Sequence, residues 1–307
     1  MVCKLKKSLY GLKQASRQWN NEFTSKLAAY GFVQSTHDNC LFLKHAETGC
    51  LALLVYVDDI LLTGPKEDSI ADVKRYLDDL FTIKDLEYAK YFLGIEIARS
   101  QDGTSITQHK YIEDIIADTG MGDAKATLTP LPLGLKFSVD EGILLLEPSW
   151  YRILVGRILY LGFTRPNISY SVQQLSQFLQ HTTDQHLSAA LHVVRYLKGS
   201  PHTSLFFPSS NSFQLVAYTD ADWASCVDTR RSVTGYCIFL IRLWSLGRQR
   251  NKILFLALQL KQNIVSWPLQ FVNSSGCPFC RRILASQLLR PFLYGVIIRR
   301  HYTLQPT

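Results

Sequence analysis

The sequence predicts an α+β fold, and three features of the 307-residue chain support this prediction. Two apolar runs of strand length, residues 51–55 and 60–64, flank the sequence Tyr-Val-Asp-Asp at residues 56–59, as in a buried or half-buried β-hairpin. Apolar residues recur at helical spacing before and after this hairpin. Residues 215–218 and 232–240 are typical of two further strands. Helices and strands that alternate in this irregular way favour an α+β architecture.

A helix is expected before the hairpin. Its apolar stripe repeats at spacings of four, four and three residues and consists of Trp19, Phe23, Leu27 and Tyr30. Gly31 stands where such a helix ends. Gln14 and Arg17 then lie at the helix entrance. A second amphipathic helix is expected after the hairpin, with the stripe Ile70, Val73, Leu77 and Leu80. Residues 86–98 are expected to form paired strands.

The second half of the chain is expected to be largely helical. Residues 127–148 are rich in Pro, Gly and Leu with little periodicity, which indicates a linker. Three helices are expected to follow, with the core stripes Leu154/Val155/Ile158, Val172/Leu175/Leu179 and Leu187/Leu191/Val194. His181, His186 and His192 occur here without metal-ligand spacing, so packing or surface positions are expected for them.

Composition narrows the class of protein. Hydrophobic residues make up 47% of the chain, which is not a disordered composition. No apolar stretch reaches the length of a membrane span and the N-terminus has no signal-peptide pattern, so no membrane association is expected. Seven cysteines without regular spacing indicate reduced thiols and an intracellular location, cytoplasmic or nuclear. The pair Cys277 and Cys280 lacks a second ligand pair for zinc.

The net charge of +8 is unevenly distributed. Residues 241–307 contain ten Lys or Arg and no Asp or Glu, so residues 1–240 carry 23 basic and 25 acidic residues, a balance of −2. Any nucleic-acid contact within residues 1–240 must therefore come from local basic patches. One such patch consists of Lys4, Lys6, Lys7, Lys13 and Arg17, for which a solvated surface is the alternative interpretation.

The adjacent carboxylates Asp58 and Asp59 indicate chemistry at the hairpin tip. Two carboxylates on apolar strands repel each other and resist desolvation. A divalent cation such as Mg²⁺ relieves both problems, because it prefers carboxylate oxygens together with substrate phosphates. The alternative is a plain turn, since Asp is a common turn residue.

Several segments resemble Ty1/copia-type retrotransposon polyproteins, in the same order along the chain. They are KSLYGLKQASRQW at 7–19, YVDD at 56–59, YFLGIEI at 91–97, YRILVGRILYL at 151–161, TRPNI at 164–168, RYLKG at 195–199 and YTDADWA at 218–224. The resemblance extends over about residues 2–240 and implies a reverse transcriptase followed by the start of an RNase H domain.

The resemblance implies an RNA-directed DNA polymerase that uses Mg²⁺ or Mn²⁺ on an RNA template and a DNA primer. It assigns catalytic metal ligands to Asp58, Asp59 and, in the RNase H domain, Asp220. It assigns nucleotide or template contacts to Gly11, Gln14, Arg17, Tyr56 and Val57. It assigns the primer grip to Phe92, Leu93, Gly94 and Glu96.

The resemblance also implies a domain order. Residues 1–126 would be a partial reverse transcriptase with palm, primer grip and start of the thumb, 127–148 a linker, 149–210 a helical connection, 211–240 a truncated RNase H-like sheet and 241–307 a non-homologous tail. We expect that a shifted reading frame produced the tail, because its codons, read one nucleotide earlier, can encode an RNase H-like continuation. We also expect that the tail does not pack against the rest of the chain.

The family uses a third carboxylate from a strand upstream of residues 7–19. The acidic residues before the hairpin are Glu22, Asp38 and Glu47, and none is a convincing substitute. The sequence therefore predicts a C-terminal fragment with weak metal binding and little or no polymerisation. The alternatives are an active reverse transcriptase and ribonuclease, a non-catalytic remnant that binds nucleic acid non-specifically, and a binding protein with a host function, which no feature specifically supports.

Overall fold

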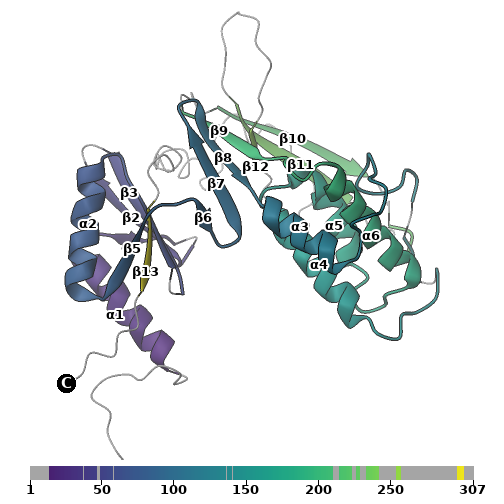
Figure 1. The fold of residues 1–307 in the computed structure, drawn as a ribbon, viewed down its shortest axis with the longest axis horizontal. Helices are drawn as coiled ribbons and strands as arrows, with labels where there is room; N and C mark the ends of the chain where they lie inside the picture. The colour runs from purple at the N-terminus through teal and green to yellow at the C-terminus, as the bar shows by residue number, and fades with distance from the viewer. Residues whose placement is uncertain are drawn as a thin grey trace, which may run out of the picture. The chain divides into compact units, whose positions relative to one another are not determined.

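The computed structural model describes residues 14–36, 38–46, 49–57, 59–135, 137–139, 141–209, 214–222, 226–228, 233–241, 254–256 and 296–300. The chain divides into two compact units (Figure 1). The first unit comprises residues 1–89 and 276–307, and the second comprises residues 90–275. Each unit has its own hydrophobic core.

The first unit combines one antiparallel sheet with two helices. The helices are α1 (Ala15–Ala29) and α2 (Glu67–Leu80). The strands are β1 (Val33–Gln34), β2 (Leu41–Ala46), β3 (Gly49–Tyr56), β4 (Asp59–Thr63), β5 (Ile83–Tyr88) and β13 (Val296–Arg300). They pair in the order β1-β2-β3-β4-β13-β5, and every neighbouring pair is antiparallel.

The core of the first unit lies between the sheet and the two helices. It contains Phe23, Leu27, Phe32, Phe42, Leu51, Leu53, Val55, Ile60, Leu62, Ile70, Val73 and Leu77. The two helices predicted around the hairpin are therefore confirmed, with Trp19 and Tyr30 only partly buried. The prediction that Leu80 belongs to the core was wrong, because this residue is 41% exposed. Leu80 is the last residue of α2 and is not among the residues that this helix buries.

The second unit contains two antiparallel sheets and a group of helices. The helices are α3 (His109–Asp118), α4 (Ser149–Leu161), the 3₁₀ turn η1 (Pro166–Ile168), α5 (Ser169–Ser176) and α6 (Asp184–Gly199). One sheet consists of β6 (Tyr91–Phe92), β7 (Ile95–Ser100), β8 (Gly103–Thr107) and β9 (Leu205–Pro208). The other consists of β10 (Gln214–Asp222), β11 (Val233–Ile241) and β12 (Leu254–Leu256).

The three helices predicted after residue 148 are confirmed as α4, α5 and α6, but two of the predicted stripes were partly wrong. Leu179, predicted on the second helix, follows the end of α5, and the stripe on α6 also differs. Its buried residues are His186, Ala189, Ala190, Val193, Val194 and Leu197. Leu187 and Leu191 are only partly buried at the margin. Because α6 contacts α3, α4 and α5, its innermost face carries small residues that allow close approach. The sequence also gave no prediction of α3, which buries Ile112 and Ile115.

Residues 127–148 contain no helix or strand among those described, but they are not separated from the helices. Leu131, Phe137 and Leu145 pack against the helical core. The Asp228 carboxylate accepts hydrogen bonds from the Ser138 hydroxyl at 2.8 Å and from the Val139 backbone N–H at 3.1 Å. This segment is therefore part of the second unit.

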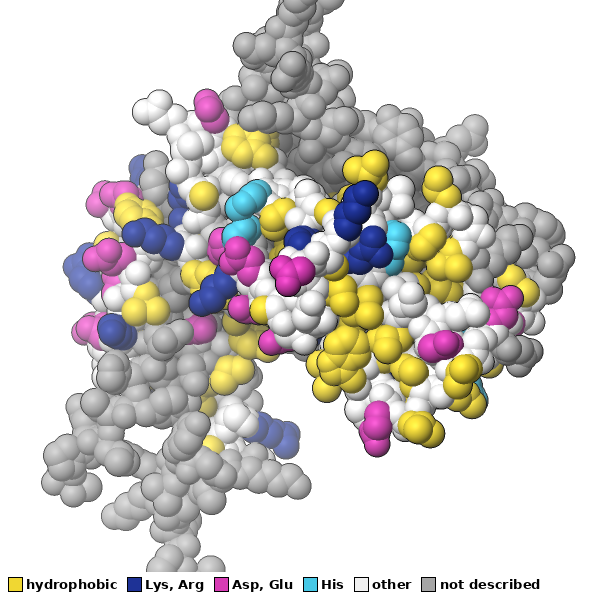
Figure 2. Space-filling view, turned by 45° about the vertical axis from the view of Figure 1, so that its right-hand side comes forward, with side chains coloured by type: hydrophobic (Ala, Val, Ile, Leu, Met, Phe, Trp, Pro, Cys, Tyr) yellow, Lys and Arg dark blue, Asp and Glu magenta, His cyan; other side chains and the backbone are white. Residues whose placement is uncertain are grey.

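The division into units differs from the expected boundary after residue 126. Residues 90–126 group with the helices because β8 pairs with β9, which follows α6 in the chain. On the face drawn in Figure 2, basic and acidic side chains are interspersed, as expected for the nearly neutral residues 1–240. Among the described residues, no helix is both long and apolar enough to cross a bilayer.

The start of α6 carries a buried histidine. Thr183 and His186 form a reciprocal capping box. Nδ1 of His186 accepts the Thr183 backbone N–H at 3.0 Å, and the ring stacks on Phe178 with centroids 4.1 Å apart. Burial lowers the pKa of His186, and this outweighs the opposing effects of Asp184 and Asp228. Folding therefore favours the neutral form of the His186 ring.

We expect this histidine to make the second unit less stable in mild acid. The unfolded chain takes up a proton at the ordinary histidine pKa of 6.5, whereas folded His186 takes it up only at lower pH. Its stabilising contribution is thus complete above pH 6.5 and is lost as the pH falls through and below that value. Thermal unfolding at several pH values should show this loss. His186→Asn, which keeps an acceptor for Thr183, should reduce the pH dependence. A slope equal to that of the unsubstituted chain would contradict the assignment.

Candidate functional site

The predicted hairpin that carries the two aspartates is confirmed. β3 and β4 pair in antiparallel register up to Tyr56 opposite Asp59, so Val57 and Asp58 connect the strands. Val55 and Ile60, one residue further from the tip on each strand, are buried, whereas Tyr56 and Val57 are 53% and 69% exposed. Asp58 lies outside the described residues. The tip is therefore displayed at the surface by a rigid apolar stem.

The backbone of this tip is strained. Val57 has φ +52°, in the left-handed region that a β-branched residue opposes. Two-residue hairpins favour turns that need positive φ, and Asn, Asp and Gly supply it most readily. Valine at this position therefore costs stability, and such strain concentrates at functional sites.

Relieving this strain should stabilise the first unit. We expect Val57→Asn to raise its free energy of unfolding by about 1 kcal/mol, because asparagine tolerates positive φ. Val33→Asn is the matched control, since Val33 is 70% exposed and has no positive φ. Denaturant dependence of hydrogen exchange in residues 49–56 measures the effect. A Val57 variant that is no more stable than the Val33 variant would show that the tip is relaxed.

Asp59 is the half-buried first residue of β4. Its register partners are Tyr56 on β3 and Arg299 on β13. Carboxylate oxygens of Asp58 and Asp59 are the donors that Mg²⁺ prefers, and Mg²⁺ commonly binds through one or two carboxylates with the remaining positions taken by water and phosphate. Within the described part of the chain, no three His, Cys, Asp or Glu residues gather closely enough to hold a metal ion by themselves. The chemistry of these two carboxylates therefore fits Mg²⁺ as part of an open site.

A second tight hairpin carries the residues that resemble a primer grip. Phe92 of β6 pairs with Ile95 of β7, which leaves Leu93 and Gly94 at the tip. Their φ angles are +48° and +76°, the combination that a type I′ turn requires. Gly94 adopts this angle without strain, whereas Leu93 does not. The Tyr160 hydroxyl of α4 donates a hydrogen bond to the Leu93 carbonyl and thereby fastens the tip to the helices.

Glu96 has a structural contact that the sequence did not indicate. It is half-buried on β7, and its carboxylate accepts the Lys110 backbone N–H at 2.8 Å. Lys110 is the second residue of α3, so the carboxylate satisfies one of the N–H groups that a helix leaves unpaired. Its negative charge also lies at the favourable end of the helix dipole. Glu96 therefore joins the second hairpin to α3.

The remaining predicted site residues lie apart from the two hairpin tips in the sequence. Gln14 and Arg17 are exposed at the start of α1, as predicted, and Gly11 lies outside the described residues. The backbone of Asp220 lies within β10, opposite Gly235. The strand predicted at residues 215–218 would have left Asp220 beyond its end, but β10 continues to Asp222. The structure thus groups Tyr56, Val57 and Asp59 on one hairpin and Phe92, Leu93, Gly94 and Glu96 on another, in different units.

Two of the resembling motifs build a buried polar network. Arg165 as a whole residue is 1% exposed, and its guanidinium donates to the Ser200 carbonyl at 2.8 Å, the Ser200 hydroxyl at 2.9 Å and Asn167 Oδ1 at 3.2 Å. Asn167 Nδ2 donates to the Tyr196 hydroxyl at 2.6 Å. Burial lowers the pKa of Arg165. The TRPNI and RYLKG segments therefore hold α6 against η1, a structural function that sequence reasoning missed.

The basic residues of RYLKG have a similar function. Arg195 donates to the Lys125 carbonyl at 2.7 Å, and Lys198 donates to the Ala124 carbonyl at 2.8 Å and to the Gly122 carbonyl. These bonds fasten the segment after α3 to α6. Only the contacts themselves reveal this, because basic side chains at this spacing are equally typical of a solvated surface.

Comparison with known proteins assigns the class. Residues 1–132 match the family model for reverse transcriptase (RNA-dependent DNA polymerase). Over 255 residues the chain is 42% identical to the Retrovirus-related Pol polyprotein from transposon RE1 of Arabidopsis thaliana, covering 82% of this chain and 17% of the polyprotein. The chain thus spans less than a fifth of that relative. No solved structure gives a significant match.

Two shorter relatives are covered over most of their length. An uncharacterized mitochondrial protein of Arabidopsis thaliana is 41% identical over 200 residues, which are 64% of this chain and 83% of the relative. A putative transposon Ty5-1 protein of Saccharomyces cerevisiae is 32% identical over 241 residues, 78% of each chain. The chain belongs to the reverse transcriptase family of Ty1/copia-type Pol polyproteins, as its motifs predicted.

Proposed function

We propose that this chain is the part of a Ty1/copia-type reverse transcriptase that carries the metal-binding hairpin and the primer grip. Asp58 and Asp59 would hold Mg²⁺ or Mn²⁺, and the exposed Tyr56 and Val57 would contact the primer end. The observation that supports this most strongly is the strained two-residue tip, which presents Asp59 beside an exposed tyrosine on a buried stem.

The other assigned residues would position the nucleic acid. Gly11, Gln14 and Arg17 would contact the incoming nucleotide or the RNA template. The tip at Leu93 and Gly94 would support the DNA primer, because Tyr160 and the helix contact of Glu96 make it rigid. These contacts need not be base-specific, since a polymerase reads sequence through template pairing.

The chemistry of DNA synthesis is an in-line displacement of pyrophosphate by the primer 3′-hydroxyl. Bound divalent ions supply stabilisation of the attacking and leaving oxygens. The chain's own contribution is to hold those ions through the hairpin carboxylates and to fix the primer end, since orientation supplies much of the rate enhancement.

We further propose that the 307 residues alone polymerise little or no DNA. β4 is flanked by β3 and β13, and the register partners of Asp59 on these strands are Tyr56 and Arg299. Neither partner adds a carboxylate to the pair. The β10–β11 hairpin would be the start of an RNase H-like sheet, in which Asp220 is the first metal-binding carboxylate.

Metal titration tests the hairpin assignment. We expect Mg²⁺ or Mn²⁺ to bind with a dissociation constant on the order of millimolar or weaker, because affinity rises with the number of charged ligands. Asp59→Asn should abolish this binding, and removing one of two like charges should not destabilise the fold. Asp78→Asn on the exposed side of α2 is the control. Micromolar affinity, or binding that survives Asp59→Asn, would contradict the partial site.

A second candidate is a non-catalytic remnant that binds nucleic acid through positive charge alone. The observation in its favour is the tail, where ten Lys or Arg occur without a single Asp or Glu in residues 241–307. Such binding would be independent of sequence and weakened by salt.

A further inference from the structure

The sheet of the first unit has an unusual order beside the candidate hairpin. β13 lies between β4 and β5 and is antiparallel to both, so β4 and β5 are parallel to each other. Figure 1 shows β13 beside β5. Together with the connecting helix α2, β4 and β5 form a βαβ unit that is split by one strand. Two strand spacings separate β4 from β5, about 10 Å. The expectation that residues 241–307 pack against nothing is therefore wrong for Val296–Arg300.

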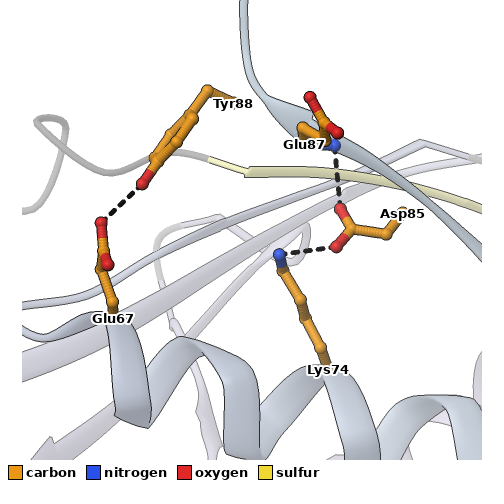
Figure 3. A network of polar contacts seen from close by, with 5 residues as sticks. All are labelled: Glu67, Lys74, Asp85, Glu87 and Tyr88. Carbon is orange, nitrogen blue, oxygen red and sulfur yellow. Dashed lines mark hydrogen bonds and ion pairs between the residues drawn. The ribbon is translucent and has the colours of Figure 1, made fainter.

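The position of β5 is fixed by contacts that do not involve β13. Figure 3 shows that Lys74 of α2 meets Asp85 of β5, with an Nζ–Oδ2 distance of 2.7 Å. The Tyr88 hydroxyl donates to the Glu67 carboxylate at 2.5 Å, and Asp85 also accepts the Glu87 backbone N–H at 2.9 Å. Because Glu67 begins α2 and Lys74 lies near its middle, β5 is attached to the helix at two separate points.

Packing holds β5 in the same place. Ile83 is the first residue of β5 and Phe81 lies just before it, and both pack against the core formed by α1, α2 and the hairpin strands. The ring of Phe81 lies 5.3 Å from that of Phe23. β5 is therefore joined to α2 and to the core by contacts that do not involve β13, and we take these contacts to keep a space one strand wide between β4 and β5.

The strand in the slot has a suitable composition. Val296, Ile297 and Ile298 are β-branched, and such residues favour extended backbone. Strand addition depends on main-chain hydrogen bonds and so tolerates many sequences. The match to β5 is imperfect, since the register shifts between Val296 and Ile298 and Glu87 of β5 has φ +62°. Pairing with β4 is regular.

We propose that the slot between β4 and β5 is a strand-acceptor site, which this chain fills with its own residues 296–300. The occupant closes the edge of β4 next to Asp59, an edge that would otherwise be open to association. Because the slot selects an extended main chain and not a particular sequence, the tail can occupy it even if, as we expect, the tail has no homology to the family. This inference rests on the sheet register and not on the proposed polymerase activity.

A proline within β13 tests the proposal in the full chain. Ile298 pairs with Ile60 on one side and Asp85 on the other, so Ile298→Pro removes a strand residue that both neighbours use. We expect amide exchange in residues 59–63 and 83–88 to become about tenfold faster or more, with α6 as an internal reference. Leu304→Pro, beyond the end of β13, is the control. Equal exchange in the two variants would overturn the proposal.

Adding β13 as a separate peptide shows whether the Ile298→Pro substitution acts by emptying the slot or by damaging the fold in general. A synthetic peptide of residues 294–302 should restore protection of residues 59–63 in the Ile298→Pro chain, and the same peptide with proline at 298 should not. No restoration by either peptide, or equal restoration by both, would contradict a strand-acceptor site.

Cross-linking provides a measurement that does not need the proline variant to fold. Ile297 and Leu61 are register partners. Cysteines at these two positions should form a disulfide on oxidation, located by peptide mapping, because directly opposed residues on antiparallel strands lie close together. Cysteines at Leu61 and Ile298, which are out of register, should form it poorly. Equal yields from the two pairs would overturn the assigned register.

Discussion

Replacing Arg165 by leucine is expected to destabilise the second unit by about 3 kcal/mol, because breaking a buried charge network leaves several polar groups unpaired. Leucine removes the donors to the Ser200 carbonyl, the Ser200 hydroxyl and Asn167. These groups join η1 to the end of α6, so the loss should separate the two elements. Denaturant unfolding followed by hydrogen exchange in α6 measures the change.

Two other variants test whether the burial of Arg165 causes the loss of stability expected for Arg165→Leu. Arg152 is exposed and donates to the Leu179 carbonyl at 2.8 Å, so Arg152→Leu should cost less than about 1 kcal/mol. Asn167→Asp should stabilise the unit, because it places a negative charge 3.2 Å from a buried cation. If Arg165→Leu is as mild as Arg152→Leu, the network does not hold the helices together.

The strongly periodic elements of the first unit could be predicted from the sequence. The stripes through Phe23 and Leu27 and through Ile70 and Val73 match α1 and α2, since an amphipathic helix on a sheet buries one narrow face. The hairpin was predictable for the same local reason. What local pattern could not show was the strain at Val57, because a backbone angle depends on the closure of the surrounding strands.

Contacts between distant segments were the part that could not be predicted. β8 pairs with β9, although all the described helices of the second unit lie between these two strands in the sequence. This pairing places the second hairpin in the same unit as the helices. The pairing of Arg165 with Ser200 and of Glu96 with the start of α3 likewise depends on the tertiary fold. Such side chains carry no periodic signal, and their charges indicated nucleic-acid contacts as readily as structural ones.

The surroundings of Asp59 were the least predictable feature of the candidate site. The sequence predicted two adjacent carboxylates, but not that Arg299 would be the register partner of one of them. Strand addition is directed by main-chain hydrogen bonds, so nothing in the five residues of β13 identifies β4 and β5 as its neighbours. The shifted-frame origin of residues 241–307 stays a prediction, which the nucleotide sequence around the codon for Leu240 can test.

We proposed that the 307 residues alone polymerise little or no DNA, and we expect an assay of the purified chain to detect no DNA synthesis. The register partners of Asp59 are Tyr56 and Arg299, and neither adds a carboxylate to the two that we propose as metal ligands. Without firmly held ions the displacement of pyrophosphate loses its main electrostatic stabilisation, a term that is often the largest in catalysis. The purified chain should therefore not extend the primer of a primer–template.

Primer extension by the full 307-residue chain on poly(rA)·oligo(dT), with dTTP and either Mg²⁺ or Mn²⁺, is the measurement that tests this most directly. Incorporation is expected to equal that of the Asp59→Asn variant, at the background of the assay. Extension well above background that Asp59→Asn abolishes would contradict the proposal and would show that the hairpin carboxylates suffice for catalysis.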